Sequence, residues 1–200
     1  MKKQIEGVTE KILSAAEKEF LEYGFNNASL RRISAASGVS THSIYTRFGD
    51  KEGLFDALVK ESADGLMEVY LGSINALDGC DDYSGMSEVG RKGTDDVLDY
   101  IYRHLTAFKL IFCCSAGTEY ADYIDRLSEI EEKAYREMLH QLNRDTSEMN
   151  DFFIHVVCSA SWHPVYEVVS HDLPLEAAKQ FMELEMQYHY AGWKAVLGLL

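Results

Sequence analysis

The chain has 200 residues and carries 19 Lys and Arg against 33 Asp and Glu, a formal net charge of −14 at neutral pH. So acidic a protein is a poor non-specific binder of nucleic acid, which confines any DNA-binding surface to one part of it. The sequence has only two prolines and no uninterrupted hydrophobic run near the roughly 18 residues of a membrane span. We therefore predict an all-α protein, and Lys2-Lys3 followed by polar residues predicts no secretion signal.

The first 50 residues predict three helices. Hydrophobic residues at helical spacing predict the first helix over residues 8–23. Ser29 is placed to cap a second helix over residues 30–37. Gly38 provides the backbone freedom of a tight turn, and a third short helix follows over residues 41–48. Two helices joined by so short a turn are typical of a helix-turn-helix.

The third predicted helix presents an unusual number of hydrogen-bonding side chains. Val39 and Ile44 provide the hydrophobic anchors that hold the turn and this helix down. The polar and aromatic residues that remain to face outward are Thr41, His42, Ser43, Tyr45, Thr46 and Arg47. Such a helix suits the major groove of DNA.

The segment from about residue 8 to 55 contains a set of short motifs at defined spacing. They are Ala15-Ala16-Glu17-Lys18-Glu19-Phe20, Tyr23-Gly24-Phe25, Leu30-Arg31-Arg32-Ile33-Ser34, Gly38-Val39-Ser40, Ile44-Tyr45, Phe48 and Asp50-Lys51-Glu52-Gly53-Leu54-Phe55. In order and spacing this set resembles the tetracycline-repressor (TetR) family of bacterial transcriptional regulators. His42 departs from the small residue that many members have at this position.

The resemblance implies an N-terminal three-helix DNA-binding domain over residues 1–50. It also implies a C-terminal helical domain for ligand binding and dimerisation over residues 51–200, with about nine helices in the whole chain. The expected function is that of a cytoplasmic homodimer that binds a palindromic operator in double-stranded DNA, usually as a repressor, until a small-molecule effector releases it. An enzyme activity and a cofactor are not expected.

The charge is divided unevenly along the chain. Residues 1–51 contain eight Lys and Arg and six Asp and Glu, a net charge of +2. The remaining 11 basic and 27 acidic residues give residues 52–200 a net charge of −16. This contrast would direct the N-terminal region toward the duplex and keep the rest of the protein away from it.

The candidate DNA contacts fall into two classes. We expect Arg31, Thr41, His42 and Ser43 to reach base edges, with Arg31 best suited to guanine, and Tyr45 to contact a thymine methyl group or the backbone. The candidates for phosphate contacts are Ser29, Thr46, Arg47 and Lys51. Lys51 would also lie at the N-terminus of the fourth helix, where an anion is favoured.

Helical patterns continue through the rest of the chain, apart from a loop rich in Asp and Gly over residues 78–85. The further helices are expected at 51–77, 87–105, 107–115, 119–144, 149–171 and 175–198. The last two are hydrophobic on more than one side, which fits both packing in the monomer and association with a second copy.

Large aromatic side chains with polar groups are concentrated in the middle of the chain. They are Tyr100, His104, Phe108, Phe112, Tyr120, Tyr123, Trp162, His163 and Tyr166. Each alone is more typical of core packing, but as a set they favour a cavity for an aromatic or amphipathic effector. The sequence does not indicate the charge of that effector.

Two further patterns keep other classes open. Adjacent Cys113 and Cys114 could sense an oxidant or a soft metal, although buried cysteines that act as small hydrophobic residues are the commoner case. Glu137-x-x-His140 has the spacing of a di-iron ligand pair but stands alone, so a metal is not expected. The alternatives to an effector-controlled regulator are the same DNA-binding fold controlled by a protein partner or without an effector and, remotely, a helical-bundle metalloenzyme.

Overall fold

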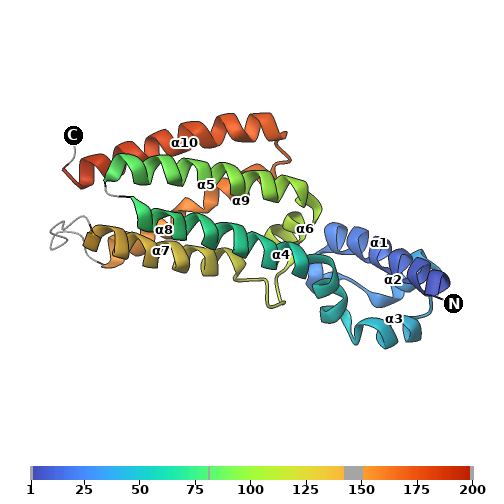
Figure 1. Cartoon of the computed structure of the whole chain (residues 1–200). Helices are drawn as coiled ribbons and strands as arrows, with labels where there is room; N and C mark the ends of the chain where they lie inside the picture. The colour runs from blue at the N-terminus through green and yellow to red at the C-terminus, as the bar shows by residue number, and fades with distance from the viewer. Residues whose placement is uncertain (1, 81, 142–150, 199–200) are drawn as a thin grey trace. The chain divides into compact units, whose positions relative to one another are not determined.

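The computed structural model describes residues 2–80, 82–141 and 151–198, and this part of the chain consists of helices joined by turns (Figure 1). No β-strand occurs in these ranges, so the all-α prediction is confirmed. The chain divides into two compact units, Met1–Gly65 with His104–Tyr123, and Leu66–Arg103 with Ile124–Leu200. None of the described helices combines the length and the hydropathy needed to cross a membrane.

The first unit contains the three predicted N-terminal helices and the beginning of the fourth. Its core is built on Phe20, Phe25 and Phe55, whose ring centroids lie 5.1 to 6.0 Å apart. The first helix is interrupted at Gly24, whose φ of 67° requires a residue without a side chain. The elements are α1 (Lys2–Asn27), α2 (Leu30–Ser37), α3 (Thr41–Phe48), α4 (Lys51–Asn75), α6 (Leu105–Lys109) and the π-helical turn η2 (Leu110–Cys114).

A distant stretch of sequence, residues 104–123, completes this unit by packing on α1 and α4. The Tyr123 hydroxyl donates a hydrogen bond of 2.6 Å to the carbonyl of Ala63, and the Tyr120 hydroxyl donates to the Asp56 carboxylate. The compact unit therefore extends beyond residue 50, while a functional boundary at residue 50 stays a prediction.

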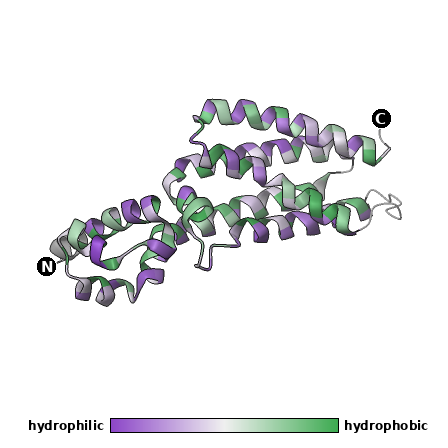
Figure 2. Cartoon of the chain, turned by 180° about the vertical axis from the view of Figure 1, so that it is seen from behind, coloured by the Kyte–Doolittle hydropathy of each residue, from purple (hydrophilic) through white to green (hydrophobic). Residues whose placement is uncertain are grey.

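The second unit takes the C-terminal part of α4 and adds helices that are amphipathic along their length, as their alternating colours in Figure 2 show. One hydrophobic cluster includes Tyr83, Ile154, Cys158 and Trp193, and the Tyr83 hydroxyl donates to the carbonyl of Tyr190 at 3.0 Å. The elements are η1 (Ala76–Gly79), α5 (Tyr83–Arg103), α7 (Tyr123–Gln141), α8 (Asp151–Ser161), α9 (His163–Ser170) and α10 (Leu175–Val196).

Three predicted boundaries were wrong. The helix predicted over 149–171 is two helices, because Pro164 lacks an N–H group and cannot continue α8 past Trp162. The loop predicted over 78–85 is shorter, because the Asp82 carboxylate accepts from the Gly85 N–H at 2.8 Å and starts α5 early. The helix predicted over 119–144 begins at Tyr123. The predicted ends at 142–144 and at 149–150 lie outside the described residues.

Candidate nucleic-acid interface and ligand cavity

Helices α2 and α3 are joined by a turn of three residues. Gly38 adopts φ 67° and ψ 18°, the left-handed conformation that ends α2. The Ser34 hydroxyl then donates to the carbonyl of Val39 at 2.7 Å and fixes the turn. Ile33 on α2 and Ile44 on α3 are fully buried beneath it. This is the geometry of a helix-turn-helix, with α3 as the second helix.

Both ends of α3 are fixed by the sequence around them. The Ser40 hydroxyl accepts from the Ser43 N–H at 3.3 Å and caps the start of the helix. Gly49, with φ 79°, ends it and donates its N–H to the carbonyl of Tyr45 at 2.9 Å. The helix is thus held at both termini while its outer surface makes no contribution to the core.

The start of α4 is packed tightly against the end of α3. The Asp50 carboxylate accepts from the Gly53 N–H at 2.8 Å and so caps α4. A Cβ atom on Gly53 would collide with the carbonyl oxygen of Phe48. The motif Asp50-Lys51-Glu52-Gly53 therefore lets α4 begin in direct contact with the C-terminus of α3.

A buried carboxylate anchors α2 to α1. Glu19, only 8% exposed, accepts from the Ser29 N–H at 2.8 Å and pairs with Arg32 at 2.5 Å. Arg32 also donates to the carbonyl of Asn27. Ser29 does lie at the N-cap of α2, but the predicted cap by its side chain was wrong: the hydroxyl makes no cap hydrogen bond, and Glu19 holds the Ser29 backbone N–H instead. Arg32 is committed to the protein rather than to a ligand.

The predicted base-reading and phosphate residues come together around α3. Arg31 on α2 and His42, Tyr45, Thr46 and Arg47 on α3 are exposed. Within α3, Thr46 donates to the carbonyl of His42 at 2.8 Å, and Arg47 donates to that of Ser43 at 3.3 Å. Ser29, Thr41 and Ser43 are half-buried. The unit thus presents a polar face that carries guanidinium, imidazole, phenol and hydroxyl groups.

Lys51 is placed differently from the other candidates. Its ammonium lies 4.4 Å from the ring centroid of Phe25 and donates to the carbonyls of Phe25, Asn26 and Ala28 at 2.6, 3.3 and 3.4 Å. These contacts tie the start of α4 to the end of α1. A phosphate contact by the same ammonium would have to replace one of these bonds.

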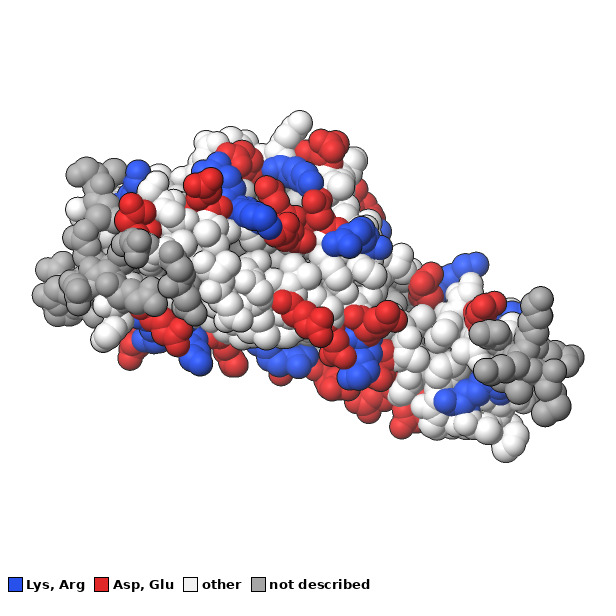
Figure 3. All heavy atoms as spheres, viewed as in Figure 1, with Lys and Arg blue, Asp and Glu red and all other residues white. Residues whose placement is uncertain are grey.

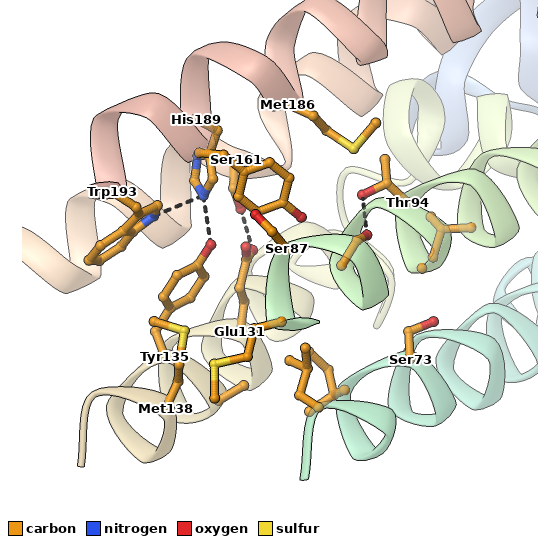
Figure 4. Close-up of a pocket in the computed structure, with 18 of the residues that line it drawn as sticks. Ser73, Ser87, Thr94, Glu131, Tyr135, Met138, Ser161, Met186, His189 and Trp193 are labelled. Carbon is orange, nitrogen blue, oxygen red and sulfur yellow. Dashed lines mark hydrogen bonds between the residues drawn. The ribbon is translucent and has the colours of Figure 1, made fainter. Parts of the chain in front are cut away.

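The second unit contains a cavity of about 170 Å³. It is bounded by the end of α4 and by α5, α7 and α10 (Figure 4). Ser161 at the end of α8, Trp162 and Val165 of α9 also line it. Its walls are mainly hydrophobic, and Met86, Met138, Met182 and Met186 supply adaptable thioether side chains. An engineered cavity of about 150 Å³ can hold a benzene molecule, so this space suits a small organic ligand.

Two carboxylates line this cavity. Glu131 points from α7 to the Ser161 hydroxyl, which donates to it (Figure 4). Burial raises the pKa of Glu131 from 4.5 to about 7 against the opposing effect of that hydrogen bond, and nearby Glu185 raises it further. Burial also raises the pKa of Glu185 on α10. The cavity therefore holds acidic groups that water solvates poorly.

His189 is the centre of a hydrogen-bonded group at the side of the cavity. The Trp193 indole N–H points to its Nε2 at 2.9 Å, and the Tyr135 hydroxyl lies 2.6 Å from the same atom (Figure 4). An indole N–H can only donate, so Nε2 must be an acceptor and the ring neutral. Burial lowers the pKa of His189, in agreement with that assignment.

Tyr70 brings a polar group from α4 to the cavity. Its ring is edge-on to Trp162 at a centroid distance of 5.0 Å. Its hydroxyl is buried and has no hydrogen-bond partner of good geometry among the described residues. Such a group is costly in an apolar environment and is best explained by a ligand or a water molecule.

The predicted ligand residues lie mostly elsewhere. Trp162 lines the cavity, whereas His104, Phe108, Phe112, Tyr120 and Tyr123 belong to the first unit. There the ring of Phe108 packs on Phe112 at 5.6 Å, and the Nδ1 of His104 lies 3.4 Å from the Ser62 hydroxyl. In the second unit, Tyr100 stacks with Arg103, while exposed His163 stacks with Tyr166 and pairs with Glu167; none of these lines the cavity.

The cavity residues that sequence reasoning missed do follow a pattern. On α10 they recur at steps of three and four, as Met182, Glu185, Met186, His189, Tyr190 and Trp193. On α7 the same spacing joins Glu131, Ala134, Tyr135 and Met138. A glutamate on an otherwise hydrophobic helix face was the available signal.

The cysteine and metal hypotheses can be compared with the geometry. Cys114 and Cys158 are buried, Cys80 is half-buried and Cys113 is exposed. Burial raises the pKa of the Cys158 thiol to about 12 and also raises that of Cys114, so both are poor thiolates. Within the described ranges, no three His, Cys, Asp or Glu side chains are grouped to hold a metal ion.

Residues 12–58 match the family described as bacterial regulatory proteins, tetR family. Over 60 residues the chain is 43% identical to the transcriptional repressor AcnR of Corynebacterium glutamicum. This match covers 30% of this chain and 32% of AcnR. Over 94 residues the chain is 35% identical to the transcriptional repressor Rv1474c of Mycobacterium tuberculosis. This match covers 42% of this chain and 50% of Rv1474c. The matches thus span about a third to a half of these relatives.

Solved structures resemble the chain over most of its length. A TetR-like regulator from a Rhodococcus species matches with a TM-score of 0.59 at 17% identity, covering 92% of this chain and 96% of that one. The TetR-family regulator PfmR from Thermus thermophilus matches with a TM-score of 0.55 at 19% identity, covering 88% and 97%. At these identities the likeness concerns the fold. Residues 12–58 therefore carry the sequence of the DNA-binding region of the tetR family, and the chain shares its fold with TetR-like regulators over most of its length.

Proposed function

We propose that the protein is a homodimeric transcriptional repressor that binds a partly palindromic DNA operator through α3 and is released by a small molecule in the cavity of the second unit. The observation that carries the proposal is the α2–turn–α3 arrangement, with a capped second helix whose polar side chains are exposed. The named AcnR and Rv1474c repressors support the direction of control. Such a regulator acts where the DNA is, in the bacterial cytoplasm.

The proposed contacts keep the two classes expected from the sequence. Arg31 and His42 are exposed where base edges would be reached, and Tyr45 is 52% exposed beside them. Arg47 is the best candidate for a phosphate. We assign Lys51 to positioning, because its bonds to the carbonyls at the end of α1 hold the N-terminus of α4 in place.

The proposed dimer surface lies on α8 and α10. Tyr188 is 80% exposed, Phe152 73% and Leu184 67%, and Val156 and Val196 are also exposed. Large hydrophobic side chains gathered on two helices at this exposure are typical of an association surface. Figure 3 shows Asp and Glu side chains, together with Lys and Arg, on the visible face of the second unit.

Two-fold symmetry would then define the operator. Two α3 helices related by a dimer axis enter successive major grooves about 34–36 Å apart, so the two half-sites should be inverted repeats.

Trp193 of α10 is not part of the proposed dimer surface. Its side chain is only 4% exposed and packs inside the second unit.

The cavity favours control by a small molecule over control by a protein partner or by abundance alone. Tyr70, Ser73 and Ile74 of α4 line it, while Leu54 and Phe55 of the same helix are buried in the first unit. A ligand that shifts α4 would act on both units through one element. A coupling free energy of about 1–3 kcal/mol would change operator affinity by about five- to 150-fold.

The test is selection of bound duplexes from random DNA with the full-length protein, followed by light scattering of the complex. The proposal predicts an inverted repeat bound by two chains. Recovery of no preferred sequence would contradict sequence-specific binding, and a single chain on a single half-site would contradict the dimer.

A further inference from the structure

The cavity of the second unit has an unusual charge balance. Glu131 and Glu185 line it, and its lining contains no Lys or Arg. Neither carboxylate forms an ion pair among the described residues. Two acidic groups are therefore kept in a mainly hydrophobic space without a cation supplied by the described part of the chain, an arrangement that costs stability.

The histidine in the wall does not compensate for this charge. The indole N–H of Trp193 donates to Nε2 of His189 at 2.9 Å, which leaves no room for a proton on that nitrogen. The ring is therefore held neutral. The two carboxylates therefore have no protonated imidazole from His189 beside them.

The remaining walls also suit a cation. The face of an aromatic ring attracts a positive charge, and Tyr70, Tyr83, Trp162 and Tyr190 all line the cavity. The buried Tyr70 hydroxyl lacks a hydrogen-bond partner of good geometry among the described residues, so it is available to accept from an ammonium group. Thioethers of Met138 and Met186 can adapt to a hydrophobic body of varied shape (Figure 4).

We propose that the effector is an organic cation, a compact hydrophobic body that bears an amine or ammonium group, with Glu131 as its principal counter-ion and Glu185 as a second one. This inference rests on the proposed effector function and specifies its ligand. A cationic group would supply the partner that both carboxylates lack. Ser161 would keep Glu131 oriented, since its hydroxyl donates to that carboxylate.

The inference makes binding dependent on pH. The groups that face Glu131 are Tyr70 of α4, Cys158 and Ser161 of α8, Glu185, His189 and Tyr190 of α10, and Tyr135 of its own helix. Of these, the tyrosines and Cys158 stay neutral near pH 7, and so does His189. With a pKa of about 7, Glu131 loses its proton between pH 6 and 8, so the affinity for a permanent cation should rise by about tenfold over this range.

Three compounds with one hydrocarbon cage and different charges test this directly. They are 1-adamantylammonium, neutral 1-adamantanol and adamantane-1-carboxylate, each titrated into the full-length protein by calorimetry. We expect the ammonium compound to bind at least tenfold more tightly than the alcohol and the carboxylate to bind least. Equal or tighter binding of the alcohol or the carboxylate, or no binding of the ammonium compound, would overturn the inference.

Variants identify the counter-ion. Glu131→Gln should weaken binding of 1-adamantylammonium at least tenfold and remove most of its pH dependence, and Glu185→Gln should weaken it less. Glu129→Gln, an exposed position on the same helix that does not line the cavity, is the matched control and should bind as the unmodified protein does. If Glu131→Gln and Glu185→Gln both fold and bind the compound unchanged, the inference fails.

DNA binding separates this inference from the proposed function. Operator affinity without any ligand tests the regulator, and the three titrations test only the charge of the effector. If the protein binds its operator and the neutral alcohol releases it, the proposed function is supported and the cationic effector is rejected. A protein without operator binding would lose the proposed function, whatever the titrations show.

Discussion

Gly53 determines how α4 can begin, and its substitution has a defined cost. In Gly53→Ala the new Cβ would collide with the Phe48 carbonyl oxygen, so we expect a loss of about 1–3 kcal/mol in the free energy of unfolding, together with weaker DNA binding. Gly72→Ala is the control on the same helix, because its Cβ would meet nothing within 4 Å. There alanine should stabilise by about 0.5–1 kcal/mol. Equal effects of the two changes in denaturant titrations would refute the close contact.

Lys51 and Arg47 should separate stability from DNA affinity. Loss of the charged hydrogen bonds to α1 in Lys51→Ala should cost roughly 1.5–3 kcal/mol of unfolding free energy. Arg47→Ala should leave stability nearly unchanged and lower the slope of log affinity against log salt by about one. Affinities measured at several salt concentrations, beside urea unfolding, distinguish the two roles. If Lys51→Ala keeps its stability but lowers the salt slope, Lys51 contacts phosphate and does not position α4.

Arg31 should carry sequence preference. We expect Arg31→Ala to cost about 1–3 kcal/mol on the preferred operator and much less on unrelated DNA, because a guanidinium that binds a guanine edge reads sequence. Competition between operator and random duplexes measures the ratio. Arg32→Ala on the same helix is a contrast, since its guanidinium is bonded to Glu19 and should act on stability. If Arg31→Ala keeps the same preference for the operator over random DNA, α2 does not contact base edges.

Glu131 should also make the stability of the unliganded protein depend on pH. Its pKa is raised to about 7 in the folded state, so the folded protein holds this proton more tightly than the unfolded chain does. The free energy of unfolding should therefore fall as pH rises from about 4.5 to 7, by roughly 3 kcal/mol for this group. Glu131→Gln should lack that fall, whereas Glu129→Gln should retain it. A pH-independent difference between Glu131→Gln and the unmodified protein would contradict the assignment.

At the scale of elements, local signals were sufficient for the helix-turn-helix. The turn predicted at Gly38 is confirmed, and Ser40 and Gly49, for which no role was predicted, cap and end α3 by contacts within a few residues. The helix break at Pro164 was equally local and could have been predicted, because proline excludes the helix interior.

The cavity could not be predicted in the same way. Phe108, Phe112 and Tyr120 are as aromatic as any residue that lines it, yet residues 104–123 return to the first unit. Which helix they pack on depends on the tertiary fold, and no helical period encodes that choice. The glutamates of the cavity looked like surface residues in a chain that has 33 acidic side chains.

At the scale of the whole molecule, the exposed hydrophobic surface on α8 and α10 predicts a dimer. Leu184→Glu should give a folded monomer, because each dimer would bury two unpaired carboxylates in the proposed surface. Leu71→Glu, at a 40% exposed leucine of α4, should remain dimeric. Light scattering at micromolar concentration gives the mass, and circular dichroism checks that helix content is kept. If the unmodified protein is a monomer, both the homodimer and the palindromic operator are rejected.

The composition of the first unit has a consequence for synthesis on the ribosome. Residues 1–65 emerge first, but Tyr120 and Tyr123, which bond to Asp56 and Ala63, follow only after all of residues 66–103. At about 5–20 residues per second, the nascent chain passes several seconds with the Phe55 side of its DNA-binding unit uncovered. A ribosome stalled near residue 100, which leaves residues 1–65 outside the exit tunnel, should therefore carry an N-terminal segment that proteases cut readily, whereas one stalled far enough beyond residue 123 for that residue to emerge should carry a resistant one.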